Sequence, residues 1–172
     1  MQLSPLQIVV LAVIAGFFVL WLVAQRKRRG QTWESLLTRL NPSLNGRAVS
    51  EYFPWKEGLS ATPDEVWDNM HGLKGVFTIY RNAQVMLDIA DFVYRNYEGV
   101  DLTLVAGIRS DAMQIRSAAM ATMLQWMLSN ATESVRTNAF RVMSMYTGMT
   151  ARMTELLQAN ANVALPAFVA AA

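Results

Sequence analysis

The stretch VFTIYRNAQVMLDIADFVYRNY, residues 76–97, decides the fold class because its apolar side chains recur every three or four residues. That spacing places them on one side of an α-helix, while charged and amide side chains occupy much of the remainder. The apolar positions are Val76, Ile79, Ala83, Met86, Leu87, Ala90, Val93, Tyr94 and Tyr97. Gly99 follows, and glycine commonly ends helices. The stretch therefore predicts a long amphipathic helix.

Two further long helices are predicted after Gly99. The first covers residues 101–129, and the second covers residues 130–160 behind a capping pair of Asn130 and Glu133. Their expected core positions are Leu104, Ile108, Ala112, Ile115, Ala119 and Met123 in the first, and Val135, Ala139, Val142, Met143, Tyr146, Met149, Met153, Leu156 and Leu157 in the second. Because the connections are short, we expect antiparallel neighbours in an up-down-up bundle.

Residues 118–128 depart from this pattern because only Thr122 and Gln125 are polar. The run is too short to cross a bilayer, which takes about 20 apolar residues. A helix that is apolar nearly all round is normally buried on most sides. We therefore expect a buried core helix here, in which Met123→Asp or Leu124→Asp unfolds the bundle.

A shorter helix precedes these three. In Thr62-Pro63-Asp64-Glu65, Thr62 is the expected N-cap, Pro63 takes the first helical position and Glu65 completes a capping box. Residues 72–75, GLKG, lack the spacing of a phosphate loop and predict a helix–helix turn. Residues 62–160 are thus predicted to form a bundle domain of three to four antiparallel helices, and the whole chain is predicted to be all-α.

Residues 25–61 join this bundle to the N-terminal segment. After a basic flank, residues 32–40 predict a short amphipathic helix, and residues 41–61 form an irregular linker with proline and glycine but no sustained periodicity. The linker carries Tyr52, Phe53 and Trp55 close together. We expect these aromatic side chains to contact a partner subunit, the bilayer interface or the domain surface.

Residues 6–24 contain a single polar side chain and no charge. A helix of this length is about 28 Å long, close to the hydrocarbon thickness of a bilayer, so it is predicted to be a transmembrane helix. The uncharged segment 1–5 lacks the positive residues that precede the apolar core of a signal peptide. Ala12 and Gly16 would let another spanning helix approach closely, and Trp21 is placed for an interfacial anchor.

Four basic residues follow this apolar run directly: Arg26, Lys27, Arg28 and Arg29. Positive residues beside a spanning helix stay on the cytoplasmic side. We therefore predict a single-pass protein of the inner (cytoplasmic) membrane, with residues 1–5 outside the cytoplasm and the bundle domain inside it. Anionic lipid head groups are a second expected contact of this basic cluster.

Composition excludes several function classes. The 172 residues include no cysteine, which rules out disulfides, thiolate metal sites and cysteine nucleophiles. Of the 15 Lys and Arg residues four lie at 26–29, so the rest of the chain has 11 basic residues against 13 acidic ones. A nucleic-acid partner is not expected, because no basic face is visible on the domain. The sequence also predicts no cofactor, no metal and no small-molecule substrate.

Residues 161–172 have no charged side chain, include Pro166 and lie beyond the last helical repeat. They are predicted to be an apolar C-terminal tail. Because solvated tails are normally more polar, we expect Leu165 and Phe168 to contact partner subunits.

The candidates for chemistry are few. His71, the only histidine, is expected to lie at a helix C-terminus near the last carbonyls, with axial ligation of a pigment or haem as the alternative. Asp88 and Asp91 are expected on a solvated helix face, and Asp111 lies on the next helix. Most of the 11 methionines fall between Met113 and Met153, where they are expected to fill the core or to form an adaptable partner-binding face.

These observations leave three hypotheses. The first is a non-catalytic accessory or structural subunit of a larger membrane complex of the energy-transducing, photosynthetic, respiratory or transport type. The second is a membrane-tethered cytoplasmic adaptor that recruits a soluble partner through the Met-rich bundle. The third, an enzyme built from Asp88, Asp91, Asp111 and His71, has the weakest support because no motif accompanies those residues.

Overall fold

The computed structural model describes residues 32–41, 44, 62–129, 133–161 and 164–171, and these ranges contain helices and turns but no strand. Trp33–Ala172 forms one compact unit. Within the described ranges, no helix combines the length and the apolar character that crossing a bilayer requires. The predicted membrane helix, 6–24, lies outside the described residues.

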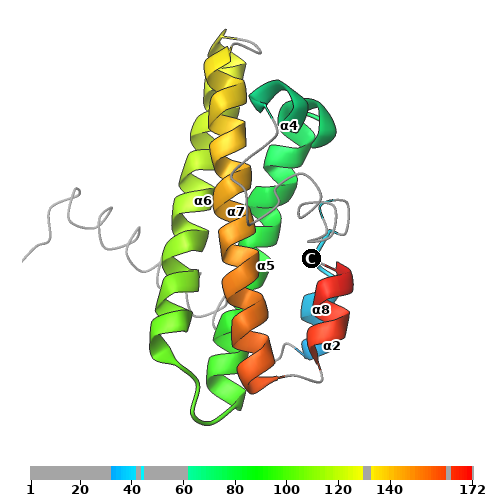
Figure 1. The fold of residues 1–172 in the computed structure, drawn as a ribbon, viewed down its shortest axis with the longest axis vertical. Helices are drawn as coiled ribbons and strands as arrows, with labels where there is room; N and C mark the ends of the chain where they lie inside the picture. The colour runs from blue at the N-terminus through cyan, green and yellow to red at the C-terminus, as the bar shows by residue number, and fades with distance from the viewer. Residues whose placement is uncertain (1–31, 42–43, 45–61, 130–132, 162–163, 172) are drawn as a thin grey trace, which may run out of the picture. The chain divides into compact units, whose positions relative to one another are not determined.

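Three long helices form the body of the unit: α5 (Leu73–Asn96), α6 (Leu102–Ser129) and α7 (Glu133–Asn160), which pack against one another (Figure 1). Cross-helix pairs fix their directions. Asp91 of α5 meets Arg109 of α6, and Gln84, two turns earlier on α5, meets Arg116, two turns later on α6. The predicted all-α bundle of antiparallel helices is thereby confirmed.

The core lies along the stripes that the periodicity predicts. All nine expected core positions of α7 are buried, as are most of those of α5 and α6. Leu87 is only half-buried, and Tyr94 and Tyr97 have 44% and 40% of their surface exposed. The two tyrosines fall in the last turn of α5 and just beyond it.

The short helix α4 (Pro63–Asn69) begins with the predicted capping box. The Glu65 backbone N–H donates to Thr62 Oγ1 at 3.3 Å, and the Thr62 N–H donates to Glu65 Oε2 at 2.7 Å. The helix packs against α7, and Arg136 of that helix pairs with Asp64 at 2.7 Å. A turn does separate α4 from α5, but it covers residues 70–72 rather than the predicted 72–75, because α5 already begins at Leu73; Gly72 has φ +61°.

Two short helices lie against the long ones. Helix α2 (Trp33–Leu37) is shorter than the predicted 32–40; it packs on α5, and its segment buries Leu36 and Leu40. Helix α8 (Leu165–Ala171) packs on both α7 and α2, and these two short helices lie side by side in Figure 1.

The prediction that Phe168 contacts a partner subunit is wrong, because Phe168 is fully buried in the chain's own core. Leu165 is half-buried and packs against the same core. The physical reason lies in Pro166, which falls in the first turn of α8, where a missing N–H costs the helix no hydrogen bond. The tail therefore forms a helix that covers apolar surface of α2 and α7.

Candidate functional site

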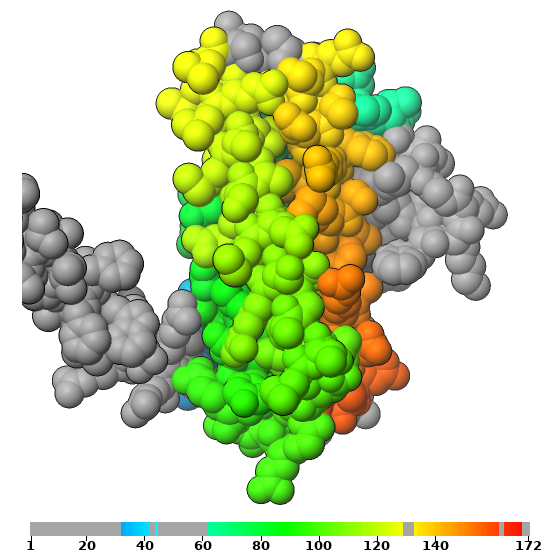
Figure 2. All heavy atoms as spheres, turned by 90° about the vertical axis from the view of Figure 1, so that its left-hand side faces the viewer, coloured from blue at the N-terminus to red at the C-terminus, as the bar shows by residue number. Residues whose placement is uncertain are grey.

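The outer side of α6 carries a group of exposed large apolar side chains. We define the α6 face as Met113, Met120, Leu124, Met127 and Leu128, whose exposed fractions are 68%, 50%, 56%, 72% and 88%. Figure 2 views the molecule from the side on which α6 lies, and the helix runs down the middle of this view. A row of exposed apolar side chains on one side of a helix is a candidate interaction surface.

The expectation that residues 118–128 are buried on most sides is therefore wrong. Helix α6 contacts α5 and α7 through a single stripe that includes Ile108, Ile115 and Ala119, and its opposite side has no helix of the described chain upon it. Leu124 lies on that opposite side, so Leu124→Asp is no longer expected to unfold the bundle. Residues 118–128 are apolar on two sides of α6, of which one packs against the core and the other is exposed.

Two arginines of α6 near this face, Arg109 and Arg116, bond to side chains of α5. Arg116 donates to Gln84 Oε1 at 2.5 Å and to the Tyr80 hydroxyl at 3.0 Å, and its guanidinium lies 4.8 Å from the Tyr80 ring centroid. Arg109 donates to Asp91 Oδ1 through two nitrogens, at 2.7 and 3.0 Å. Both charges are thereby held at the border with α5, and the exposed row from Met113 to Leu128 stays uncharged.

An aromatic pair borders the α6 face on the α5 side. Phe77, which is 49% exposed, stacks on Tyr80 with ring centroids 6.4 Å apart and ring planes at 15°. Since Gln84 is level with Arg116, the antiparallel register places Tyr80 and Phe77 level with the following turns of α6, near Met120 and Met123. The exposed Phe77 thus adds an apolar side chain of α5 beside α6.

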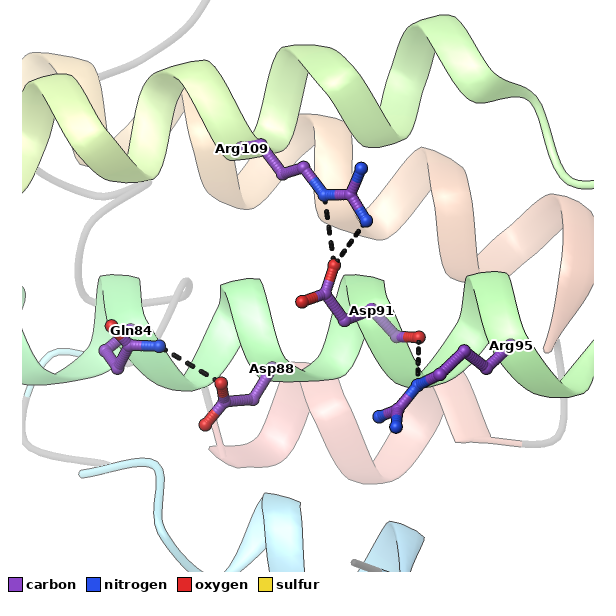
Figure 3. A network of polar contacts seen from close by, with 5 residues as sticks. All are labelled: Gln84, Asp88, Asp91, Arg95 and Arg109. Carbon is purple, nitrogen blue, oxygen red and sulfur yellow. Dashed lines mark hydrogen bonds and ion pairs between the residues drawn. The ribbon is translucent and has the colours of Figure 1, made fainter. Parts of the chain in front are cut away.

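The acidic residues considered as candidates for chemistry are engaged in separate pairs (Figure 3). Asp88 receives Gln84 Nε2 at 3.0 Å and pairs with Arg39 at 3.0 Å. Asp91 pairs with Arg109 in the same view. Each pair joins two elements of the fold, which is a structural use of the carboxylate.

The predicted solvated face for Asp88 and Asp91 is wrong for Asp88, which is only 5% exposed. The segment after α2 covers it and supplies Arg39, a contact that helical spacing within α5 alone does not reveal. Asp111 lies apart from both, in an ion pair with Arg152 of α7. The structure therefore does not gather Asp88, Asp91 and Asp111 into one site.

Sequence reasoning missed a buried polar cluster around Asn82. This side chain accepts from the Asn41 backbone N–H at 2.9 Å and donates to the Asn41 carbonyl at 3.2 Å and to the Tyr146 hydroxyl at 3.1 Å. Burial raises the pKa of Tyr146 to about 12, against a partial opposing effect of its hydrogen bonds. The sequence offered one signal of this cluster, the amide residue Asn82 beside the apolar stripe of α5. A buried amide needs hydrogen-bond partners, so its position indicated a polar contact inside the core.

His71 lies just beyond α4, as expected, but its backbone rather than its imidazole meets the last carbonyls. The His71 N–H donates to the Asp68 carbonyl and the Gly72 N–H donates to the Trp67 carbonyl, which is the Schellman pattern. His71 has φ +62° and is exposed. In the described ranges, no three histidine or acidic side chains converge as a metal site would require.

Most of the predicted contact residues lie outside the ranges that the structure describes. Those outside the described residues are Ala12, Gly16, Trp21, Arg26, Lys27, Arg28, Arg29, Tyr52, Phe53 and Trp55. The α6 face is the described surface that combines exposure, apolar character and absence of charge, and we take it as the candidate site for protein contact.

No known protein family matches this chain, and neither the characterised proteins nor the solved structures include a significant match.

Proposed function

We propose that the chain is a non-catalytic accessory subunit of a larger membrane protein complex, anchored by one transmembrane helix at residues 6–24. The observation that carries this proposal is the α6 face, an uncharged and exposed row of Met and Leu side chains. Burying such a row against protein gains about 25 cal/mol per Å² of apolar area, whereas leaving it in water gains nothing.

The use of the polar side chains supports the same conclusion. Asp88, Asp91 and Asp111 hold elements of the fold together through arginine partners, and Asn82 ties three segments to one another. Chemistry on a substrate requires titratable groups that converge on a shared cleft. The surface that this domain offers is suited to binding another protein.

The anchor and its orientation are part of the proposal. The apolar run 6–24 has the length of a membrane span, and Arg26 to Arg29 favour a cytoplasmic domain with the N-terminus outside. In this arrangement other spanning subunits would contact the anchor near Ala12 and Gly16, where small side chains allow close approach.

Co-purification tests the proposal. The full chain, tagged at its C-terminus, is extracted from native membranes in a mild detergent, and the species are separated by size and identified by mass spectrometry. An accessory subunit should recover other membrane proteins at constant stoichiometry through successive washes. Recovery of the chain alone, as monomer or homo-oligomer, would contradict the proposal.

The second candidate is a membrane-tethered adaptor that recruits a soluble partner, and the methionines of the α6 face favour it. Methionine is flexible and polarisable and suits surfaces that accept several partners. An adaptor should release its partner on dilution and recapture it from the soluble fraction. Constant stoichiometry through the washes would count against it.

A further inference from the structure

The exposed side of α6 has the regular spacing of a helix-packing seam. Ser110, Met113, Ser117, Met120, Leu124 and Met127 follow one another at alternating intervals of three and four residues. This is the a/d pattern with which helices pack side chains between one another, and at 1.5 Å per residue the seam is about 26 Å long. Met120, Leu124 and Met127 of this seam lie in residues 118–128, where α6 is apolar on both faces. Met113 and Ser117 lie in the turns just before this region.

We infer that a second copy of this chain covers the seam, with the two α6 helices antiparallel. This inference rests on the proposed membrane-anchored assembly and names the first partner in it. If a two-fold axis passes between Ser117 and Met120, the six positions meet in three kinds of layer. In these layers Ser110 lies opposite Met127, Met113 opposite Leu124, and Ser117 opposite Met120 of the second copy.

Size complementarity favours this pairing. Two of the three kinds of layer set a small serine against a large methionine, so Met120 and Met127 of each copy meet small side chains of the other, and Met113 meets Leu124 between them. In an isologous interface residue i meets residue j and residue j meets residue i, and the intervals of this seam read the same in both directions, so two antiparallel copies can align all six positions.

Charge is also compatible with self-association. The same axis places Arg116 level with Ala121 of the second copy, so the two Arg116 side chains do not face each other. Each Arg116 is already held by Tyr80 and Gln84 of its own chain. The seam therefore brings together no like charges, which would oppose a symmetric contact.

The size of the seam favours a copy on the same membrane over a soluble partner. Stable soluble complexes bury about 1,200–2,000 Å² in total, and one pair of helices over about 26 Å lies at or below the lower end of that range. Anchoring both copies to one bilayer raises their effective concentration, so a small interface suffices.

Cysteine cross-linking in native membranes tests the geometry, and the chain has no cysteine of its own to remove. Chains with Met113→Cys and chains with Leu124→Cys, carrying different tags, are produced together and oxidised with copper phenanthroline. The antiparallel layer predicts a disulfide-linked dimer that carries both tags. Either variant produced alone should give little dimer, because Met113 and Leu124 lie far from their own counterparts across this axis.

Ser144→Cys, at an exposed position of α7, is the collision control when produced with Leu124→Cys. The inference is overturned if the mixed pair gives no dimer, if the control gives as much, or if Leu124→Cys links to a different protein instead. Strong cross-linking of Met113→Cys alone would mean parallel helices and would also overturn it.

A charge in the seam supplies an independent test. Leu124→Glu sets two carboxylates into apolar layers, and we expect the dimer in detergent to dissociate on the order of a hundredfold more readily, as measured by light scattering or mass photometry. Leu102→Glu is the matched control, since Leu102 is similarly exposed at 61% but lies outside the seam. Thermal melting should be nearly the same for both variants, because both positions are exposed. Equal dimer stability in the two variants would refute the pairing.

The pairing and the accessory-subunit proposal fail in different ways. If other subunits co-purify but the mixed pair does not cross-link, only the pairing is wrong. If the mixed pair cross-links but nothing else co-purifies, only the accessory-subunit proposal is wrong.

Discussion

Gly75 shows how a single residue fixes the packing of α4 on α5. A Cβ at this position would lie 2.3 Å from the Met70 carbonyl oxygen and 2.7 Å from Met70 Cβ. The main chain of the turn therefore approaches α5 at a distance that only glycine permits. Gly148, inside α7, has no such neighbour, and a Cβ there would meet nothing within 4 Å.

This contrast predicts opposite effects of the same substitution. Gly75→Ala should destabilise the fold by about 1–3 kcal/mol, because the turn at Met70 must move. Gly148→Ala should stabilise it by about 0.5–1 kcal/mol, since alanine loses less conformational entropy than glycine in a helix. Urea unfolding of the two full-length variants in detergent measures both, and equal signs would contradict the close approach at Gly75.

Tyr146 makes the stability of the fold depend on alkaline pH. Its folded-state pKa of about 12 exceeds the ordinary value of 10.0, so the folded state holds the phenolic proton more tightly than the unfolded state does. The resulting stability, about 3 kcal/mol, is fully present below pH 10 and is lost as the pH rises through 12.

Tyr146→Phe should remove this part of the pH dependence. Unfolding free energies measured from pH 9 to pH 12 should fall less steeply for the variant than for the wild type. Tyr97→Phe is the control, because Tyr97 is 40% exposed. Identical slopes for the wild type and Tyr146→Phe would show that the buried hydroxyl does not contribute as described.

At the scale of elements, α8 changes the meaning of the C-terminal segment. Sequence alone suggests a tail beyond the bundle, whereas α8 covers α2 and α7 and buries Phe168. Since α2 in turn carries the segment that binds Asn82 and Asp88, the two short helices and α5 support one another.

Phe168→Ala should therefore destabilise the domain by about 3–5 kcal/mol, as expected for a fully buried aromatic ring. Val169→Ala, at the neighbouring position that is 48% exposed, should cost less than about 0.5 kcal/mol. Removal of residues 161–172 should likewise weaken the fold, contrary to the expectation for a free tail. Thermal melts that do not separate Phe168→Ala from Val169→Ala would contradict the burial.

At the scale of the whole molecule, the proposed membrane anchor implies an orientation for the domain. The one-sided basic cluster Arg26 to Arg29 predicts the cytoplasm. A C-terminal alkaline phosphatase fusion should be inactive and a C-terminal fluorescent protein should fold and fluoresce. Replacement of the four basic residues by Gln should give a mixture of orientations. An active phosphatase fusion on the unaltered chain would refute the topology.

Much of the fold could be predicted from the sequence, because helical periodicity and capping are local. The stripes of α5 and α7, the capping box at Thr62 and the turn at Gly72 depend on residues within a few positions of one another. The candidate site could not be predicted in the same way. Periodicity identifies the side chains that share a face, but it does not identify which face another element covers.

The sequence by itself therefore determined the three long helices, their order and their antiparallel arrangement, since these follow from local spacing and short connections. Only the tertiary structure decided that Phe168 and Asp88 are covered, that Asn82 meets Asn41 and Tyr146, and that the Met-rich side of α6 is open. The physical reason is that burial depends on contacts between segments far apart in the chain. The sequence of a helix that is apolar on two faces is the same whether the second face contacts the chain's own core, solvent or another copy of the chain.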